Sequence, residues 1–470
     1  MRLAWFSPFP PARTGIAGRS AELVAALGAR GFTIDVYVDR RAANGPEQVR
    51  PAHDFVWEHA RSPYDLVVYQ FGNSSHHDYI WPYALRYPGL VVLHETCLQH
   101  ARAALLLRER RPDDYRAEFA WSHPELNPDL AELAVAGLDS ALYYEWPMTR
   151  ALIETSRLVA VHGGAAAILE GATPHTRIRS IHLGEGEPLS PAREAEARHR
   201  IRQRYTLPDD EVVFGCFGGL APEKRVSQIL DALAAIAPYA PTARLLLAGA
   251  TAAHFDVDAE IGRRGLRDRV TRTGYLATDA ELTDHLAACD VSLNLRWPTA
   301  RETSGPWLRA MAAGRPTVIT DLTHLGEVPS LDPRTWRTNP VGMRDPERGM
   351  RDESAASGIP RTASRVPDPV CIAIDILDED HSLRLAMRRL AGDADLRARL
   401  GGTARAWWRQ HHSLEPMVDD YVRTIGEAAS LPAPSVELPA HVRPDGTSRL
   451  RALVEPFGLA DALSRDGLLE

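Results

Sequence analysis

Short apolar runs alternate with amphipathic helical patterns along most of the chain. In the first half these runs predict strands at residues 3–6, 33–38, 66–69, 90–93 and 158–161. Several of them lack polar alternation, which is typical of parallel strands covered on both faces. Between the first two strands an amphipathic helix pattern ends at Gly31, a residue that favours a helix C-terminus.

The alternation restarts in the second half and predicts a second sheet. Its strands are expected at residues 212–217, 245–248, 270–273, 291–295, 317–320 and 372–377. After Pro222, the residues Val226, Ile229, Leu230 and Leu233 define one apolar helix face. Two separate series of strands and helices predict an α/β protein with two open, mostly parallel sheets.

Polar and Pro-rich stretches place the domain boundaries. The prediction is a first Rossmann-like domain, a linker with a lead-in helix, a second Rossmann-like domain, a further helix and a C-terminal tail. The expected ranges are 1–184, 185–205, 206–412, 413–428 and 429–470. Residues 331–367 are rich in Pro, Gly, Ser, Arg and Asp without an apolar period, which predicts an insertion that lacks regular structure.

Composition narrows the class of protein. A chain of 470 residues exceeds one hydrophobic core, and 44% hydrophobic with 25% charged residues is ordinary for a globular protein. The net charge of −8 argues against nucleic acid as a partner. The four cysteines are far apart, which favours reduced thiols and a cytoplasmic location.

Two features of the sequence bear on membrane contact. No signal peptide and no bilayer-spanning apolar run is recognised, so a soluble protein is expected. The helical stretch 101–111 places Leu105–Leu107 beside arginines, which leaves open a peripheral contact at the inner face of an anionic membrane.

Chemistry is expected beyond the carboxyl ends of the strands, where open parallel sheets bind ligands. In the first domain, Gly15 opens the first helix and either exposes backbone N–H groups to an anion or makes a simple tight turn. His94 ends the fourth strand and is either a structural hydrogen-bonding group or a functional one. The pair His76-His77 is interpreted as surface rather than as a metal site.

The second domain offers two stronger motifs. Lys224 and Arg225 follow a Gly-Gly turn near a helix N-terminus, an unfavourable place for cations that a bound diphosphate would offset; the alternative is two solvated basic residues. Ser304 and Gly305 suit a helix start, and Glu302 just before them either caps that helix or accepts hydrogen bonds from sugar hydroxyls.

These motifs resemble a known family. The stretches 7–17, 214–224 and 302–316, with 400–408 near the end, are similar to retaining glycosyltransferases of the GT-B fold, family four (glycosyl transferases group 1). The resemblance covers roughly residues 1–425 outside the 331–367 insertion. It implies two Rossmann-like domains that face each other across a cleft, with a C-terminal helix that crosses back to the first domain.

The resemblance also implies roles for residues. His94 and Glu302 would be catalytic, with Glu302 holding the transferred sugar, and Lys224 would bind the donor diphosphate. Further donor-binding positions are Gly15, Gly219, Arg225, Tyr275, Arg296, Thr303, Ser304, Gly305 and Arg309. The donor would be a nucleotide-diphosphate sugar and the acceptor a saccharide or lipid-linked saccharide of polysaccharide biosynthesis. No cofactor and no metal is expected.

Two departures from the family pattern bear on the site. Gly219 stands where the family usually has an arginine, and Arg225 or Arg296 is the candidate substitute. Glu302 is one residue out of register with the family's first glutamate, and Arg309 stands where the second glutamate usually holds the ribose. The nucleotide, the acceptor and the oligomeric state therefore stay open.

The resemblance implies transfer with retained anomeric configuration, in which the departing phosphate helps to deprotonate the acceptor. Three alternatives stand beside it. One is an NAD-type dehydrogenase, which the spacing of Gly15 and Gly18 disfavours. The others are a sugar-nucleotide epimerase and a catalytically silent relative that binds sugar nucleotide or a partner protein.

Overall fold

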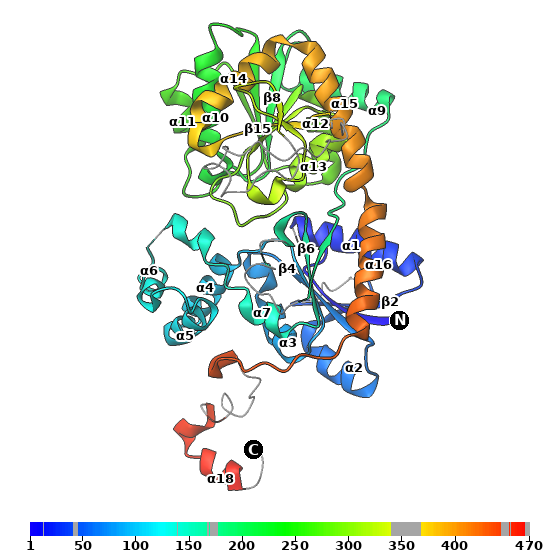
Figure 1. Ribbon diagram of the computed structural model, residues 1–470, viewed down its shortest axis with the longest axis vertical. Helices are drawn as coiled ribbons and strands as arrows, with labels where there is room; N and C mark the ends of the chain where they lie inside the picture. The colour runs from blue at the N-terminus through cyan, green and yellow to red at the C-terminus, as the bar shows by residue number, and fades with distance from the viewer. Residues whose placement is uncertain are drawn as a thin grey trace, which may run out of the picture. The chain divides into compact units, whose positions relative to one another are not determined.

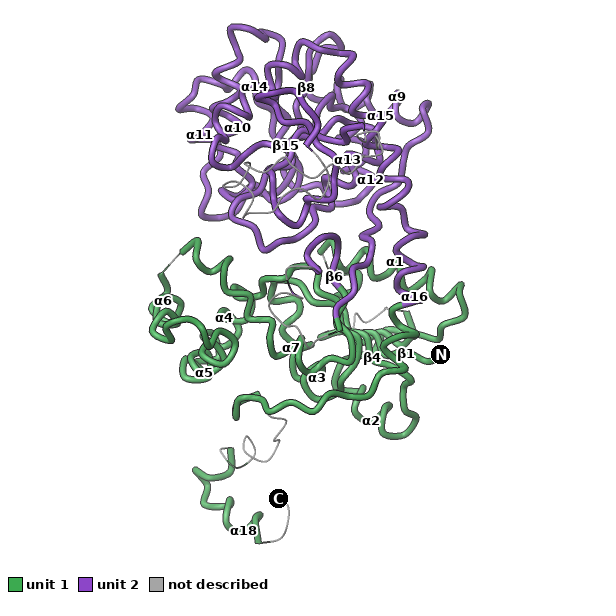
Figure 2. The backbone as a smooth tube through the Cα atoms, viewed as in Figure 1, with its two compact units in different colours: residues 1–160, 175–177, 424–470 green, residues 161–174, 178–423 purple. Residues whose placement is uncertain are grey.

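The computed structural model describes residues 1–12, 14–40, 46–138, 140–166, 169, 177–339, 368–442, 451 and 453–465. The chain divides into two compact units. Unit 1 comprises residues 1–160, 175–177 and 424–470, and unit 2 comprises residues 161–174 and 178–423 (Figure 2). This division places the linker range 185–205 and the end of the predicted first domain in unit 2.

The first sheet has seven strands in the order β3-β2-β1-β4-β5-β6-β7. The pairings of β1 with β2 and β4, of β2 with β3 and of β4 with β5 are all parallel, as predicted. The division between the units falls within β6. The strands are β1 (Arg2–Phe6), β2 (Thr33–Val38), β3 (Val49–Pro51), β4 (Leu66–Phe71), β5 (Leu90–Leu93), β6 (Leu158–His162) and β7 (Ile178–Ile181).

Several helices pack on this sheet, and three of them form a separate cluster beside it. Figure 1 shows α4, α5 and α6 together, beside the sheet. Their shared core includes Leu106, Tyr115 and Phe119. Leu105 and Leu106 are buried, so two of the three leucines that suggested a membrane contact face the protein interior. The helices are α1 (Gly15–Ala29), α2 (Phe55–Arg61), α3 (Trp81–Arg86), α4 (Gln99–Arg108), α5 (Pro112–Ser122), α6 (Ala131–Val135) and α7 (Arg150–Thr155).

The second sheet has eight strands in the order β10-β9-β8-β11-β12-β15-β13-β14, all parallel except β14. Because β8 lies centrally, the loop after it opens at the middle of the carboxyl edge. The strands are β8 (Val212–Phe217), β9 (Ala243–Ala248), β10 (Val270–Gly274), β11 (Val291–Asn294), β12 (Thr317–Thr320), β13 (Ser330–Leu331), β14 (Thr338–Asn339) and β15 (Cys371–Ile374).

The helices of unit 2 pack their predicted apolar faces on this sheet. The four residues that predicted the face of α10 are all fully buried in its core. The long helix α16 begins in unit 2 and ends in unit 1, in agreement with the helix predicted at 413–428. The helices are α9 (Pro191–Arg204), α10 (Val226–Ile236), α11 (Val257–Arg263), α12 (Asp279–Ala288), α13 (Gly305–Ala312), α14 (Glu379–Gly392), α15 (Ala394–His411) and α16 (Leu414–Ser430); α18 (Ala460–Arg465) lies in the tail.

The predicted insertion at 331–367 is ordered at its start. Residues 331–339 carry the end of β13 and the antiparallel strand β14, so the prediction that they lack regular structure is wrong. The pairing of β13 with β15 explains the order, because it extends the sheet beyond what apolar periodicity reveals. The remaining positions, 340–367, lie outside the described residues.

Three further observations bear on the class of protein. Across the described ranges, no helix has the length and apolar content needed to cross a membrane. The same ranges contain no group of three or more His, Cys, Asp or Glu residues arranged to hold a metal ion. All four cysteines are free and buried.

Candidate functional site

The strand β8 ends in a turn that brings Lys224 to the carboxyl edge of the second sheet. Gly218 has a φ of +98°, a left-handed conformation that favours glycine. Pro222–Lys224 form a 3₁₀ turn, and Arg225 has a φ of +57° where α10 begins. A Cβ added to Gly218 would lie 3.7 Å from both Lys224 Nζ and Pro306 Cγ. The ammonium therefore lies beside the backbone of this turn and near the first turn of α13.

Lys224 is buried without a counter-ion. The residue is only 9% exposed, and among the described residues no carboxylate oxygen comes within 4 Å of its ammonium. Burial, together with the nearby Arg296 guanidinium, lowers the pKa of Lys224 to about 8. An unpaired buried cation is costly, so a site of this kind is expected to receive an anion.

Glu302 is held from three sides. Arg296 Nε lies 2.5 Å from its Oε1, and Thr299 Oγ1 donates to its Oε2 at 3.0 Å. The ring nitrogen Nε2 of His324 lies 3.2 Å from the main-chain oxygen of Glu302. Burial lowers the pKa of His324, so the ring is neutral at pH 7 and donates through Nε2–H to that oxygen. These contacts fix both the carboxylate and the backbone that carries it.

The first turn of α13 completes this group. Ser304 occupies the N-cap position as predicted, but its hydroxyl makes no capping hydrogen bond. With Lys224, Arg296 and Glu302, it lines a crevice of about 20 Å³, which has room for roughly one water-sized group. The crevice therefore accommodates a single polar group, and the rest of any larger ligand would lie outside it.

Two predicted donor-binding arginines of unit 2, Arg225 and Arg309, lie in other surroundings. Arg225 Nε lies 2.8 Å from an oxygen of the buried Glu379, at the start of α14. Arg309 Nε donates to Glu185 at 2.6 Å, and its Nη2 lies 2.8 Å from a carboxylate oxygen of Asp279. Both guanidinium groups thus have carboxylate partners within the protein.

The remaining predicted donor-binding residues of unit 2 lie in loops after its strands and at the start of α13. Tyr275 is 53% exposed after β10, and Gly219 is exposed in the turn after β8. Gly305 is the first residue of α13, and Thr303 lines a second cavity beside it. The structure therefore brings Lys224, Arg296, Glu302 and Ser304 together in the crevice lining and places Gly305 and Tyr275 outside it.

Unit 1 contributes the two remaining predicted residues. His94 lies just after β5, and its Nε2 lies 2.7 Å from Gln70 Oε1 at the neighbouring end of β4. Gly15 begins α1, whose N-cap Thr14 accepts a hydrogen bond from Ala17 N–H at 3.0 Å. Both residues stand at the carboxyl edge of the first sheet, where ligand-binding groups were expected.

One interpretation of unit 1 is corrected. His77 was expected at the surface but is only 2% exposed, and its Nδ1 lies 3.0 Å from the main-chain oxygen of Gln70. A Cβ added to Gly72 would lie 2.9 Å from His77 Nε2, so the ring fills the space beside this glycine. The polar neighbours of His77 in sequence concealed this packing, while His76 is exposed as expected.

The sequence analysis missed two residues that support Glu302, and it also missed that the sequence contains a single lysine. Thr299 and His324 fix Glu302, and His324 lies just past β12 at the sheet edge where functional groups were sought. Lys224 is also the only lysine in the whole sequence, beside 53 arginines, a bias visible without any structure. Lysine differs from arginine in having a pKa that burial can shift into the physiological range.

Comparisons with known proteins agree with this architecture. Residues 211–334 match the model of the family described as Glycosyl transferases group 1. The GDP-mannose-dependent alpha-(1-6)-phosphatidylinositol dimannoside mannosyltransferase of Mycobacterium tuberculosis is 30% identical over 134 residues, or 28% of this chain. That match spans only 33% of the relative's length.

Two solved structures resemble almost the whole chain. Sucrose-phosphate synthase from Thermosynechococcus elongatus has a TM-score of 0.57 and 17% identity, covering 90% of this chain and 97% of its own. Anabaena HepE in complex with UDP and glucose has a TM-score of 0.54 and 16% identity, covering 91% and 99%.

The two sheets and these structural likenesses define a two-domain α/β protein of the GT-B class. Within it, residues 211–334, which carry Lys224 and Glu302, match the glycosyl transferases group 1 model, and the predicted resemblance to that family is confirmed over this segment.

Proposed function

We propose that this protein is a glycosyltransferase that moves a sugar from a nucleotide-diphosphate-sugar donor to a saccharide or lipid-linked saccharide acceptor, with retention of anomeric configuration. The observation that carries the proposal is the buried and unpaired Lys224 ammonium beside the start of α13. A helix N-terminus and a desolvated cation both favour an anion, and a donor diphosphate is such an anion.

The groups around Lys224 fit the charge changes of this reaction. As the bond between sugar and phosphate breaks, negative charge grows on the departing diphosphate, and Lys224 with Arg296 would stabilise it. Arg296 would thereby supply the positive charge that the family's usual arginine provides at the position of Gly219. Glu302, held by Thr299 and His324, would accept hydrogen bonds from the hydroxyls of the transferred sugar.

The relatives support the class of donor. The mycobacterial mannosyltransferase is named as GDP-mannose-dependent, and the Anabaena protein was crystallised with UDP and glucose. No metal or cofactor takes part in the proposed reaction. Acceptor deprotonation falls to the departing phosphate, and His94 at the carboxyl edge of the first sheet is proposed as a further catalytic residue.

The test is to incubate purified protein with UDP-, GDP-, dTDP- and ADP-sugars and to measure nucleotide binding by calorimetry and sugar transfer by mass spectrometry. We expect one nucleotide class to bind, with Lys224→Ala weakening binding at least 100-fold. Arg244→Ala, a change on a strand remote from the crevice lining, is the matched control and should bind normally. Equal binding by Lys224→Ala would contradict the proposal.

A catalytically silent relative is the second candidate, and one observation favours it. Oε2 of Glu302 accepts a hydrogen bond from Thr299, and Oε1 forms a close ion pair with Arg296 although it accepts no hydrogen bond from a described residue. If that arrangement persists with the donor bound, Glu302 positions Arg296 rather than binding the sugar. Tight nucleotide binding without transfer or donor hydrolysis for any sugar would identify this second function.

A further inference from the structure

A second, larger cavity lies in unit 2 on the other side of the Glu302 loop. It has a volume of about 270 Å³, near the lower end of small-molecule sites. We call it the histidine–tryptophan cavity. Five ring side chains and one carboxylate characterise its lining: Trp307, Trp407, His182, His324, His411 and Glu327. Trp307 also lines the small crevice at Lys224, so the two spaces share a wall.

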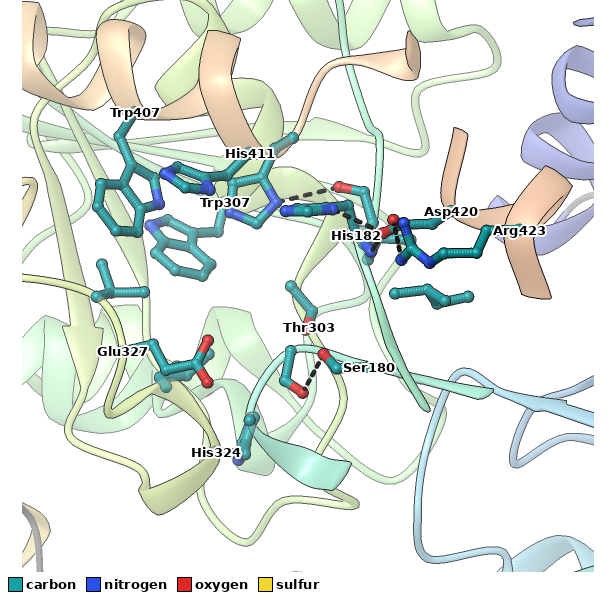
Figure 3. A pocket seen from close by; sticks show the side chains of 17 residues that line it. Ser180, His182, Thr303, Trp307, His324, Glu327, Trp407, His411, Asp420 and Arg423 are labelled. Carbon is teal, nitrogen blue, oxygen red and sulfur yellow. Dashed lines mark hydrogen bonds and ion pairs between the residues drawn. The ribbon is translucent and has the colours of Figure 1, made fainter. Parts of the chain in front are cut away.

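Aromatic rings form one side of this cavity. The rings of Trp407 and His411 have centroids 4.2 Å apart, and those of His411 and His182 lie stacked at 5.9 Å. Figure 3 shows Trp407, Trp307 and His411 grouped along one side, with Glu327 on the other. Flat aromatic faces of this kind offer an apolar surface to a ring-shaped ligand.

Several polar groups of the lining have no partner. Trp407 Nε1–H is buried and makes no hydrogen bond within the described ranges, although buried indole N–H groups usually find an acceptor. Neither the Glu327 carboxylate nor the Thr303 hydroxyl makes a hydrogen bond or ion pair with any described residue. The cavity thus presents one buried donor without an acceptor, and beside it the exposed Glu327 carboxylate and the half-buried Thr303 hydroxyl are available to a ligand.

The charged groups of the lining select against an anionic ligand. His182 Nδ1 lies 2.7 Å from an Asp420 oxygen, and Arg423 Nη2 donates to the other oxygen at 2.6 Å. Burial lowers the pKa of His412 to about 4 and also lowers the pKa of His411, so both rings are neutral at pH 7, whereas the hydrogen bond to Asp420 raises the pKa of His182. The positive groups are paired, which disfavours a phosphate and favours a neutral molecule rich in hydroxyls.

From this combination we propose that the histidine–tryptophan cavity binds one neutral sugar unit of the acceptor. A sugar ring combines an apolar face for Trp407 with hydroxyls for Glu327 and Thr303. Thr303 follows Glu302 in the chain, and His324 joins the cavity to the Glu302 main chain. The acceptor role rests on the proposed transferase function; the binding of a sugar does not.

The test measures binding of methyl glycosides of glucose, mannose, galactose and N-acetylglucosamine to the full-length protein by isothermal titration calorimetry. At least one glycoside should bind saturably, and Trp407→Ala should weaken it at least tenfold. Trp57→Ala, which changes a tryptophan 75% exposed on α2, is the control and should bind normally. No saturable binding of any glycoside, or equal binding by Trp407→Ala, would overturn the proposal.

Two further variants keep the test decisive if Trp407→Ala unfolds. Trp407→Phe retains an aromatic face but removes the N–H donor, and Glu327→Gln removes the charged acceptor; each should weaken glycoside binding threefold or more without changing the melting temperature. Displacement of the glycoside by free uridine or guanosine would instead identify a nucleobase site and overturn the proposal.

Nucleotide binding by the same proteins separates the two proposals. Trp407→Phe should bind the nucleoside diphosphate normally, and Lys224→Ala should bind the glycoside normally. Glycoside binding without nucleotide binding would contradict the transferase proposal alone. Nucleotide binding without glycoside binding would contradict the cavity proposal alone.

Discussion

At the scale of single residues, burial decides which form of Lys224 is present. Its pKa of about 8 means that the ammonium predominates at pH 7 and the neutral amine above pH 8. A bound diphosphate would restore the counter-charge that the protein omits and would raise the pKa again. Anion binding and protonation of Lys224 are therefore coupled.

This coupling predicts a pH dependence of nucleotide affinity. Because only the ammonium form binds, affinity should fall about tenfold per pH unit above pH 8 and be nearly flat below pH 7. In Lys224→Arg the guanidinium stays charged over this range, so the slope should vanish even if affinity at pH 7 falls. Calorimetric titration with the preferred nucleotide from pH 6.5 to 9.5 measures both; an unchanged slope in Lys224→Arg would contradict the assignment.

His77 makes a second prediction, for stability. Burial lowers its pKa to about 4, below the value of 6.5 in an unfolded chain. The unfolded state therefore binds the proton more tightly, and stability is lost as pH falls from 6.5 towards 4, by roughly 3 kcal/mol in all. Denaturant unfolding of His77→Gln should lack this part of the slope, while His76→Gln, altered at the exposed neighbour, should retain it. Identical slopes in the two variants would show that His77 is not buried as described.

At the scale of elements, Arg225 ties the start of α10 to the start of α14. Its partner Glu379 is 6% exposed, so removing the guanidinium would leave a buried carboxylate unpaired. This role differs from the donor-binding role that the sequence predicted for Arg225, and the two can be separated experimentally.

We expect Arg225→Ala to lower the free energy of unfolding by roughly 3 kcal/mol while leaving nucleotide affinity unchanged. Adding Glu379→Gln should restore part of that stability, because it removes the orphaned charge. Arg116→Ala, in a surface pair with Glu132, should have little effect. Denaturant unfolding and calorimetry on the same samples measure both properties; weaker nucleotide binding by Arg225→Ala would restore the donor-binding role.

Prediction from sequence succeeded where a pattern repeats within one element. Strands β2, β5, β8 and β12 have the predicted bounds, because buried parallel strands are uninterrupted apolar runs. The edge strands β3, β7 and β14 were missed, since short strands of mixed polarity carry no apolar pattern of their own and are stabilised by pairing with the strand beside them.

The site shows the same limit. The motif order identified Lys224 and Glu302, which lie on the loops that follow the neighbouring strands β8 and β11. The partners of the arginines could not be read from sequence, because Glu379 lies 154 residues from Arg225 and Glu185 lies 124 residues from Arg309. Tertiary structure alone decides which guanidinium groups are already neutralised and which face a ligand.

At the scale of the whole molecule, the two sheets each present loops at a carboxyl edge, and unit 2 carries two adjoining spaces of different character. The crevice at Lys224 is cationic and small, and the histidine–tryptophan cavity is aromatic and larger. An anionic leaving group and a neutral sugar are the two kinds of ligand that a glycosyl transfer brings together, and these spaces match them in kind.

The presence of a single lysine makes the central claim directly measurable. Protein labelled with [¹³Cε]lysine gives one lysine signal, whose shift against pH reports the pKa of Lys224 alone. We expect a pKa near 8 in the free protein that rises by at least one unit when the preferred nucleoside diphosphate binds. A pKa near 10.5 that does not respond to any nucleoside diphosphate would contradict it.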